Sequence, residues 1–339
     1  MQRAFLVAVL EADGDIEIVG EATTALDAIA LTARLRPDVV TLDLEIPEGG
    51  GLHALEQIMA FNPTPVVVLS STVQSDRSAS AIAALVGGAL MVVPKPARWT
   101  PTLERELRAN VRLVRNVPVI RHVKGRLRAT VAAAPDRTAA PVVNSSTGSP
   151  PVVAIAASTG GPPALSAVLG GLAGLEAPVL VVQHLHPDFV QGLAEWMTRV
   201  SPLPVVIAEH GQLARRGHVH IGPGGVHLRL GPGSRIELIE RPTSVHRPSA
   251  DQLFRSVAEV AGGEAVGVIL TGMGDDGAAG LAAMHSNGAH TIGQDEATSA
   301  IYGMPKAAYA LGALDQVLPL SSIADAILCA VHERTRTRR

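Results

Sequence analysis

Apolar positions along the N-terminal third of the chain recur with two different spacings. A spacing typical of amphipathic helices covers residues 5–12, 25–35 and 79–89. Short apolar runs typical of strands cover residues 16–22, 38–44, 64–71 and 90–96. Because strands that alternate with helices form parallel sheets, this part of the chain predicts an α/β fold.

A second alternating pattern fills the C-terminal half. Its strands are expected at residues 152–157, 178–184, 204–209, 218–222, 265–272 and 290–294. Between the two patterns, a closing helix is expected over 101–117, and the stretch 131–151 has the Ala-, Pro-, Ser- and Thr-rich composition of a linker. The sequence therefore predicts two doubly wound parallel-sheet α/β domains. Their ranges are 1–100 and 152–330, with the helix and linker 101–151 between them and a basic tail at 331–339.

Composition and charge narrow the classes of partner. The 339 residues carry a net charge of −3, which gives no bulk attraction to nucleic acid or to a membrane surface. No apolar run reaches the roughly 18 residues of a membrane span, and no secretory signal is evident. The single cysteine, Cys329, excludes an internal disulfide and is typical of a reducing compartment. We expect a cytoplasmic protein that neither binds nucleic acid nor inserts into a membrane.

Three residue types that cooperate in acyl transfer follow strands of the second pattern. Ser158 and His184 lie at the ends of the first two strands, and Asp276 follows the strand at 265–272. Ligands of open parallel sheets bind at the carboxyl ends of the strands, so these side chains can converge. A serine nucleophile, a histidine base and a carboxylate that orients the imidazole are what ester hydrolysis requires.

The turn around Ser158 allows two interpretations. The sequence AASTG at 156–160 resembles a nucleophile elbow, and the N–H groups of Gly160 and Gly161 at the following helix could face an oxyanion. A serine before a helix with proline in its first turn is equally typical of an ordinary N-cap. The sequence TGMGDDG at 271–277 offers a rival function, a dinucleotide site, but two adjacent carboxylates in that loop would repel a pyrophosphate.

Six segments in order carry a resemblance to a known family. They are AIAASTGGPPAL, VLVVQHLHPDF, HIGPGGVHL, HRPSADQLFRSVA, ILTGMGDDGAAGL and QDEATSAIYGMPKAA. Together they resemble the chemotaxis receptor methylesterases, the CheB family. This resemblance implies hydrolysis of glutamyl methyl esters on chemoreceptors and, in many members, deamidation of receptor glutamines. It implies no cofactor and no metal for this reaction.

The same resemblance assigns roles to single residues. The family's catalytic serine, histidine and aspartate fall on Ser158, His184 and Asp276, whereas Asp275 receives no role. The residues implied to shape the oxyanion and substrate site are Thr159, Gly160, Gly161, Met273 and Gly274, together with Gln183.

The N-terminal region resembles a response-regulator receiver domain. Asp43 falls on the family's phosphoacceptor, and Ser70 and Lys95 fall on the hydroxyl and lysine that contact the phosphoryl group. Receivers begin with a strand that ends in a Mg²⁺-binding acidic pair, but Met1 aligns within the first helix, so we expect both to be absent. Either the start codon is misassigned or the receiver is degenerate. A chemotaxis histidine kinase is the implied phosphodonor. We expect poor Mg²⁺ binding and poor phosphorylation, because Mg²⁺ sites rely on such carboxylates. The alternative to an enzyme is therefore a binding module that regulates chemosensory signalling without catalysis.

Overall fold

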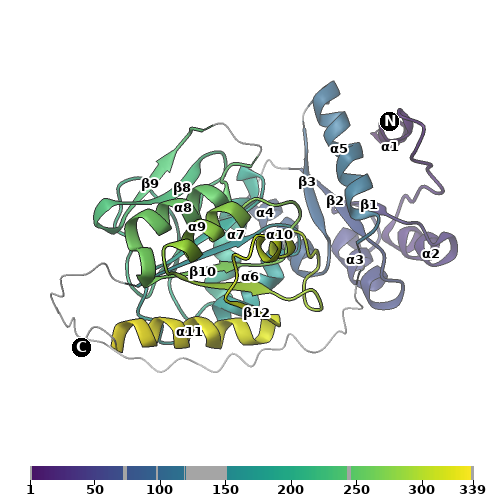
Figure 1. Cartoon of the computed structure of the whole chain (residues 1–339). Helices are drawn as coiled ribbons and strands as arrows, with labels where there is room; N and C mark the ends of the chain where they lie inside the picture. Colours follow the sequence, from purple (N-terminus) through teal and green to yellow (C-terminus); the bar gives the residue numbers. More distant parts are fainter. Residues whose placement is uncertain are drawn as a thin grey trace.

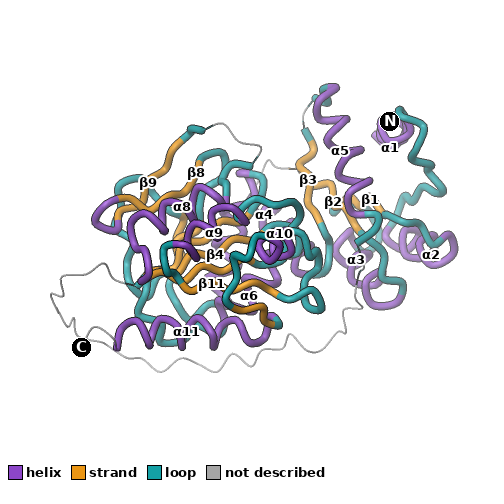
Figure 2. Tube along the Cα trace, in the orientation of Figure 1, coloured by secondary structure: helices purple, strands orange, loops and turns teal. Residues whose placement is uncertain are grey.

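The computed structural model describes residues 2–71, 75–96, 98–117, 119, 151–242 and 246–336. The chain forms two α/β halves that lie against each other, with α1–α3, β1–β3 and α5 in one and the elements from β4 onward in the other (Figures 1 and 2). Nearly all of the linker predicted at 131–151 lies outside the described residues. No helix in the described part of the chain is both long enough and apolar enough to cross a membrane.

The N-terminal half confirms most of the predicted alternation. Its helices are α1 (Gln2–Glu11), α2 (Ala25–Leu35), α3 (Gly50–Phe61), α4 (Ser75–Val86) and α5 (Pro101–Val114). Its strands are β1 (Val40–Asp43), β2 (Val66–Ser71) and β3 (Met91–Lys95). Within the described residues these strands form a parallel sheet in the order β1-β2-β3. The helix α3 was not predicted.

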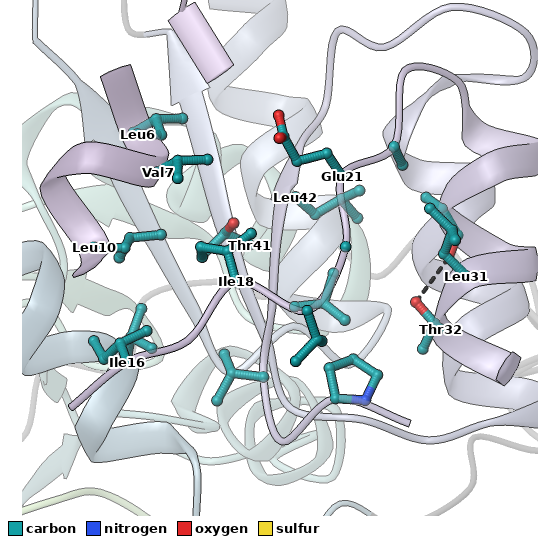
Figure 3. A pocket seen from close by; sticks show the side chains of 18 of the residues that line it. Leu6, Val7, Leu10, Ile16, Ile18, Glu21, Leu31, Thr32, Thr41 and Leu42 are labelled. Carbon is teal, nitrogen blue, oxygen red and sulfur yellow. Dashed lines mark hydrogen bonds between the residues drawn. The ribbon is translucent and has the colours of Figure 1, made fainter. Parts of the chain in front are cut away.

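The strand predicted at 16–22 is wrong, because this segment has no regular secondary structure. A strand needs a hydrogen-bonding neighbour, and in the described part of the chain none pairs with this segment. Instead a cavity of about 690 Å³ separates it from β1. Figure 3 shows Leu6 and Leu10 of α1, Ile16 and Ile18 of the segment, and Leu42 of β1 around this space.

The edge of β1 that faces the cavity has backbone groups with no backbone partner among the described residues. Val40 N–H donates to Pro65 O across 2.9 Å, so Val40 and Leu42 direct their backbone groups toward β2. Thr41 and Asp43, which both line the cavity, direct theirs to the other edge. Among the described residues, the backbone of 16–22 likewise makes no hydrogen bond to other backbone groups. The N-terminal sheet is therefore open on this side.

Ion pairs tie the segment before 16–22 to the rest of the half. Arg108 Nε and Arg112 Nη2 both lie against Asp13 Oδ2, at 2.8 and 2.6 Å, and Arg112 Nη2 also contacts Asp15 Oδ1 at 2.7 Å. Burial of Leu107 with residues of α1 adds an apolar contact beneath them. Helix α1 is thus held against α5 by ion pairs and apolar contacts.

The C-terminal half contains a larger sheet. Its strands are β4 (Val152–Ala157), β5 (Val179–Gln183), β6 (Val205–Ile207), β7 (Val219–Ile221), β10 (Ala265–Ile269), β11 (His290–Gln294) and β12 (Gln316–Leu318). In the described part of the chain they form a seven-stranded sheet in the order β12-β11-β10-β4-β5-β7-β6, with every neighbouring pair parallel. All residues of β4, β5 and β10 are buried, which explains their continuous apolar runs.

Helices cover both faces of this sheet. They are α6 (Gly161–Gly170), α7 (Pro187–Val200), α8 (Ala250–Ala261), α9 (Ala278–Ser286), α10 (Met304–Ala310) and α11 (Leu320–Arg336). An antiparallel hairpin of β8 (His227–Gly231) and β9 (Arg235–Ile239), which was not predicted, packs against α8. Helix α11 extends to Arg336 and Arg334 Nε donates to Gly263 O, so much of the basic tail predicted at 331–339 is helical.

The two halves meet through α4 and α7. Gly192 N–H in α7 donates to Ser78 Oγ in α4 across 3.1 Å. A Cβ atom at position 192 would come within 2.4 Å of that oxygen, so glycine is what permits this approach. Helix α7 begins three residues after His184, which places the contact close to the site described next.

Candidate active site

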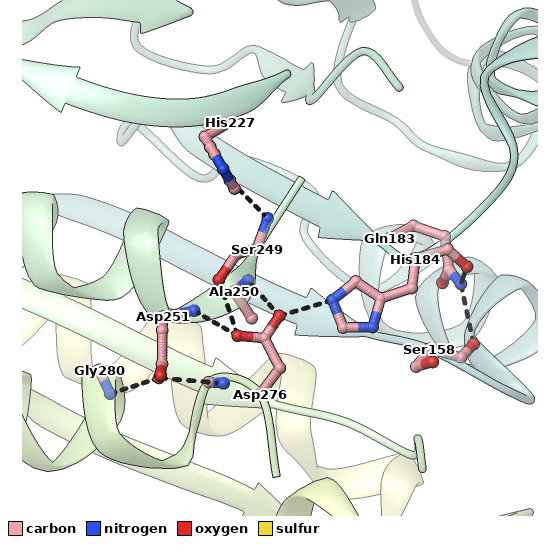
Figure 4. A network of polar contacts seen from close by, with 10 residues as sticks. Ser158, Gln183, His184, His227, Ser249, Ala250, Asp251, Asp276 and Gly280 are labelled. Atoms are coloured by element: carbon pink, nitrogen blue, oxygen red, sulfur yellow. Dashed lines mark hydrogen bonds and ion pairs between the residues drawn. The ribbon is translucent and has the colours of Figure 1, made fainter. Parts of the chain in front are cut away.

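The three predicted acyl-transfer residues lie at one edge of the larger sheet. Strands β10, β4 and β5 are neighbours in that order, and Asp276, Ser158 and His184 follow their carboxyl ends. Figure 4 shows the three side chains grouped there, with His184 between the other two. The structure therefore brings together residues that are 118 positions apart at the extremes.

His184 contacts Asp276 through one ring nitrogen. The Nε2 atom lies 2.8 Å from Asp276 Oδ2. When the ring is neutral and donates this Nε2 proton to the carboxylate, Nδ1 carries the free lone pair. Nδ1 is buried and has no hydrogen-bond partner among the described residues. Ser158 lies on the side of the ring away from Asp276, so Nδ1 is the nitrogen available to take its proton (Figure 4).

Asp276 accepts hydrogen bonds at the start of helix α8. Ser249 Oγ donates to its Oδ1 at 2.8 Å, Asp251 N–H donates to Oδ1 at 3.1 Å, and Ala250 N–H donates to Oδ2 at 2.7 Å. Burial alone would raise the pKa of Asp276. The hydrogen bond and charge of His184, with the Ala250 and Ser249 donors, outweigh it and hold the pKa well below its usual value. Asp276 therefore stays ionised beside His184.

Asp251, in the first turn of α8, makes the corresponding contact with the start of α9. Its Oδ1 accepts hydrogen bonds from Gly277 N–H at 3.0 Å and Gly280 N–H at 2.6 Å, at the start of α9. The carboxylate before α9 thus caps α8, and a carboxylate in the first turn of α8 caps α9. Burial raises the pKa of Asp251. The sequence analysis did not identify Asp251, although it lies in the HRPSAD segment before an amphipathic helix.

Ser158 lies in a sharp turn held by backbone bonds. Its N–H donates to Thr271 O at 3.0 Å, and its carbonyl accepts from Gly161 N–H at 2.8 Å and from Gln183 Nε2 at 2.8 Å. The N-cap of α6 is Gly160, with φ of 75° and no side-chain cap. Ser158 is therefore not the N-cap of this helix, which removes the alternative interpretation of its hydroxyl.

The backbone N–H groups expected to face the oxyanion differ in whether another group already accepts from them. Gly161 N–H is engaged by Ser158 O, so it does not face a substrate oxygen as the sequence suggested. Met273 and Gly274 belong to a loop that lies against Ser158, because a Cβ on Gly272 would come within 2.7 Å of Ser158 Cβ. In the part of the chain that the structure describes, the N–H groups of Met273 and Gly274 have no acceptor.

Thr159 and Gln183 take part in hydrogen bonds that hold the same turn. Thr271 Oγ1 donates to Thr159 O at 3.0 Å, which joins the Ser158 turn to the loop after β10. The buried Gln183 side chain also donates to His184 O at 3.0 Å, so one amide fixes the backbone of both Ser158 and His184. Because these bonds involve the backbone oxygens of Ser158 and His184, Gln183 positions the turn.

The predicted phosphoacceptor group assembles at the end of the smaller sheet. Asp43 ends β1, buried Ser70 lies in β2, and Lys95 ends β3. Lys95 Nζ forms an ion pair with Asp43 Oδ2, and Glu45 N–H donates to Asp43 Oδ1 at 2.9 Å. No group of three or more His, Cys, Asp or Glu side chains among the described residues has a metal-binding arrangement. Lys95 and the Glu45 N–H thus each contact one carboxylate oxygen of Asp43.

Each half of the chain matches a known protein family. The family described as CheB methylesterase matches residues 153–327, and the response regulator receiver domain matches residues 1–105. The chain belongs to the CheB methylesterase family. A protein-glutamate methylesterase/protein-glutamine glutaminase of Agrobacterium fabrum is 43% identical over 333 residues, covering 96% of this chain and 92% of the relative. A protein of the same description from Myxococcus xanthus is 42% identical over 338 residues, covering 98% and 94%.

One solved structure resembles the C-terminal half. The CheB methylesterase catalytic domain of Thermotoga maritima is 34% identical, with a TM-score of 0.52. It covers 55% of this chain, and 99% of that domain is matched. The CheB assignment and the two-domain α/β fold predicted from the sequence are thereby confirmed.

Proposed function

We propose that this protein hydrolyses glutamyl methyl esters on methyl-accepting chemoreceptors, with Ser158, His184 and Asp276 as its catalytic residues. The observation that carries the proposal is the His184 Nε2–Asp276 Oδ2 contact of 2.8 Å, with the unpartnered Nδ1 on the side of Ser158. The names of the relatives, which include glutaminase, support deamidation of receptor glutamines by the same residues.

The first half of the reaction forms an acyl-enzyme. His184 Nδ1 removes the hydroxyl proton while Ser158 Oγ attacks the ester carbonyl carbon. The imidazolium that results is stabilised by ionised Asp276. Collapse of the tetrahedral intermediate breaks the bond to the methoxy oxygen, which takes the proton from Nδ1 and leaves as methanol. In the second half, water attacks the acyl carbon by the same route and releases the glutamate carboxyl group and Ser158. For a glutamine, ammonia leaves in place of methanol.

The oxyanion of the tetrahedral intermediate needs donors that are already in place. The N–H groups of Met273 and Gly274 fit this role, since their loop lies against Ser158 and they have no acceptor among the described residues. Gly160 N–H is the third donor that we assign, from the Ser158 turn. Loss of one such donor is typically worth about 10²–10³ in turnover.

The partners follow from the two halves. The C-terminal half acts on chemoreceptors in the cytoplasm, and a chemotaxis histidine kinase is the partner that the receiver half implies. Because Asp43 is paired with Lys95 and belongs to no metal-binding cluster of three or more ligating side chains among the described residues, we propose that the chain works without Mg²⁺-dependent phosphorylation.

Methanol release from methylated chemoreceptor by the purified full chain tests the proposal. Time-dependent methanol formation, with a matching gain of receptor carboxylates, is the expected result. Binding of the receptor without methanol or ammonia release would instead identify a non-catalytic module and overturn the enzyme assignment.

A further inference from the structure

A second imidazole covers one face of the catalytic histidine. The ring of His246 stacks on that of His184, with centroids 4.2 Å apart and planes inclined by only 8°. His246 comes from the loop before α8, whereas His184 follows β5, so the contact joins two parts of the chain that are distant in sequence. His246 is partly exposed and His184 is buried beneath it.

The loop that carries His246 is anchored on both sides by a third histidine. His227, which is fully buried, lies with Nε2 2.7 Å from Pro242 O, and its Nδ1 accepts from Ser249 N–H at 3.1 Å. Gly225 N–H also donates to Arg247 O at 3.1 Å. These bonds hold the chain at Pro242, Arg247 and Ser249, so the stacking has a built support.

We infer that His246 is a positioning residue that holds the His184 ring in the orientation joining Asp276 to Ser158, and that it acts as a neutral ring. This inference rests on the proposed esterase mechanism. A single contact, Nε2 to Oδ2, leaves the imidazole free to turn about that axis. A flat ring packed at 4.2 Å removes this freedom and keeps Nδ1 directed at the serine.

The charge of His246 decides whether the stack helps the reaction. Among the charged and titratable groups that act on it are His184, Asp276 and Asp275. Burial and the neighbouring His184 lower the pKa of His246, and their effect outweighs the two carboxylates, which raise it. A neutral ring is attracted to the His184 imidazolium that forms during catalysis, whereas a cation there would repel it.

Three substitutions separate ring shape from charge. His246→Ala removes the stacking ring, His246→Phe keeps a flat neutral ring, and His246→Arg places a permanent cation at the same position. The control is His332→Ala, because His332 is exposed on α11. For each, we would measure the rate at which a small fluorophosphonate labels Ser158, which needs no receptor, and methanol release from methylated receptor across pH.

His246→Ala should lower both rates by about 10²-fold, the usual effect of a misplaced catalytic group. His246→Phe should recover most of the loss with an unchanged pH profile. His246→Arg should lower the plateau rate, because a permanent cation beside His184 disfavours the imidazolium that forms during catalysis. Labelling of the alanine variant at the wild-type rate, or a phenylalanine variant as slow as alanine, would overturn the inference. Fluorophosphonate labelling without methanol release in the wild type would instead count against the proposed substrate alone.

Discussion

Both sheets of the molecule place chemically important carboxylates at the ends of parallel strands. The two sheets differ in whether the strand at the site is paired on both sides. In the larger sheet, β4 pairs with strands on both sides, and Ser158 at its end meets His184 and Asp276 from the flanking strands. In the smaller sheet, Asp43 ends β1, which is paired only with β2 in the described part of the chain. A site assembled from several strands depends on all of its neighbours.

The two carboxylates also differ in what holds them. Asp276 receives three hydrogen bonds from the start of α8 and still presents an oxygen to His184. Asp43 is held by Lys95 and by one backbone N–H, beside a cavity of about 690 Å³. The negative charge of Asp276 is thus held beside His184, whereas the negative charge of Asp43 is balanced by Lys95. The following experiments compare the two.

Replacing Ser158 should give the largest effect. Ser158→Ala removes the nucleophile, so methanol release should fall by about 10⁶-fold, with a residue of activity from the oxyanion donors. The fold should be retained, because the hydroxyl does not cap α6. Circular dichroism is the control for folding, and turnover near the wild-type rate would contradict the mechanism.

Asp276→Asn should have the next largest effect. An amide cannot hold the required tautomer of His184, so turnover should fall by about 10⁴-fold. Asp275→Asn is the matched control, since Asp275 is exposed and adjacent, and it should retain nearly full activity. Equal losses in the two variants would contradict the assignment of roles in this loop.

The same pair of variants makes a pH prediction. Because the folded-state pKa of Asp276 lies below its usual 3.8, the ionised group stabilises the fold fully above that pH. This contribution is lost as the pH falls from about 3.8 toward the folded-state pKa. Urea unfolding of Asp276→Asn should therefore depend less on pH in that window than unfolding of Asp275→Asn.

The sequence predicted the complete sheet better than the open one. Residues 152–157 and 290–294 were predicted with the observed bounds, because each lies between two neighbouring strands and is apolar or fully enclosed along most of its length. The segment 16–22 has a strand-like pattern but no strand to pair with among the described residues, and a pattern records a segment's preference rather than its partners.

The candidate active site likewise contains some residues that the sequence predicted and others that it did not. Ser158, His184 and Asp276 could be predicted because they follow predicted strands. Asp251 and the stack of His246 on His184 depend on where two loops come together, which local patterns do not show. Engagement of Gly161 N–H by Ser158 O likewise depends on the detailed turn, so the oxyanion donors were only partly predicted.

A moderate effect is expected where the two halves touch. Gly192→Ala would place Cβ 2.4 Å from Ser78 Oγ, and such overpacking typically costs about 1–3 kcal/mol. If packing on α7 supports the open N-terminal sheet, calorimetry should show that half unfolding at a lower temperature in this variant. The control is Gly170→Ala, whose nearest contact would be an ordinary 3.5 Å. Identical unfolding curves for the two variants would show that α4 and α7 adjust freely.

The smallest change is expected at Asp43. A small phosphodonor such as acetyl phosphate, supplied with Mg²⁺, should leave the full chain almost unphosphorylated and its methanol release unchanged. The physical reason is that the cation neutralises charge between donor and acceptor, and the described residues around Asp43 include no cluster of three or more ligating side chains that could hold it. Asp43→Ala should therefore match the wild type in both measurements.

An added segment turns this null result into a positive test. An N-terminal extension designed as an apolar strand ending in two acidic residues should enter the cavity and pair with the free backbone groups of Thr41 and Asp43. Its carboxylates would then lie near Asp43 and complete a set of oxygen ligands for Mg²⁺. We expect Mg²⁺-dependent phosphoryl incorporation in the extended chain, abolished again by Asp43→Ala. Incorporation at Asp43 in the unextended chain, with a change in methanol release, would show that the open sheet already supports phosphorylation and that the contrast between the two halves is structural rather than functional.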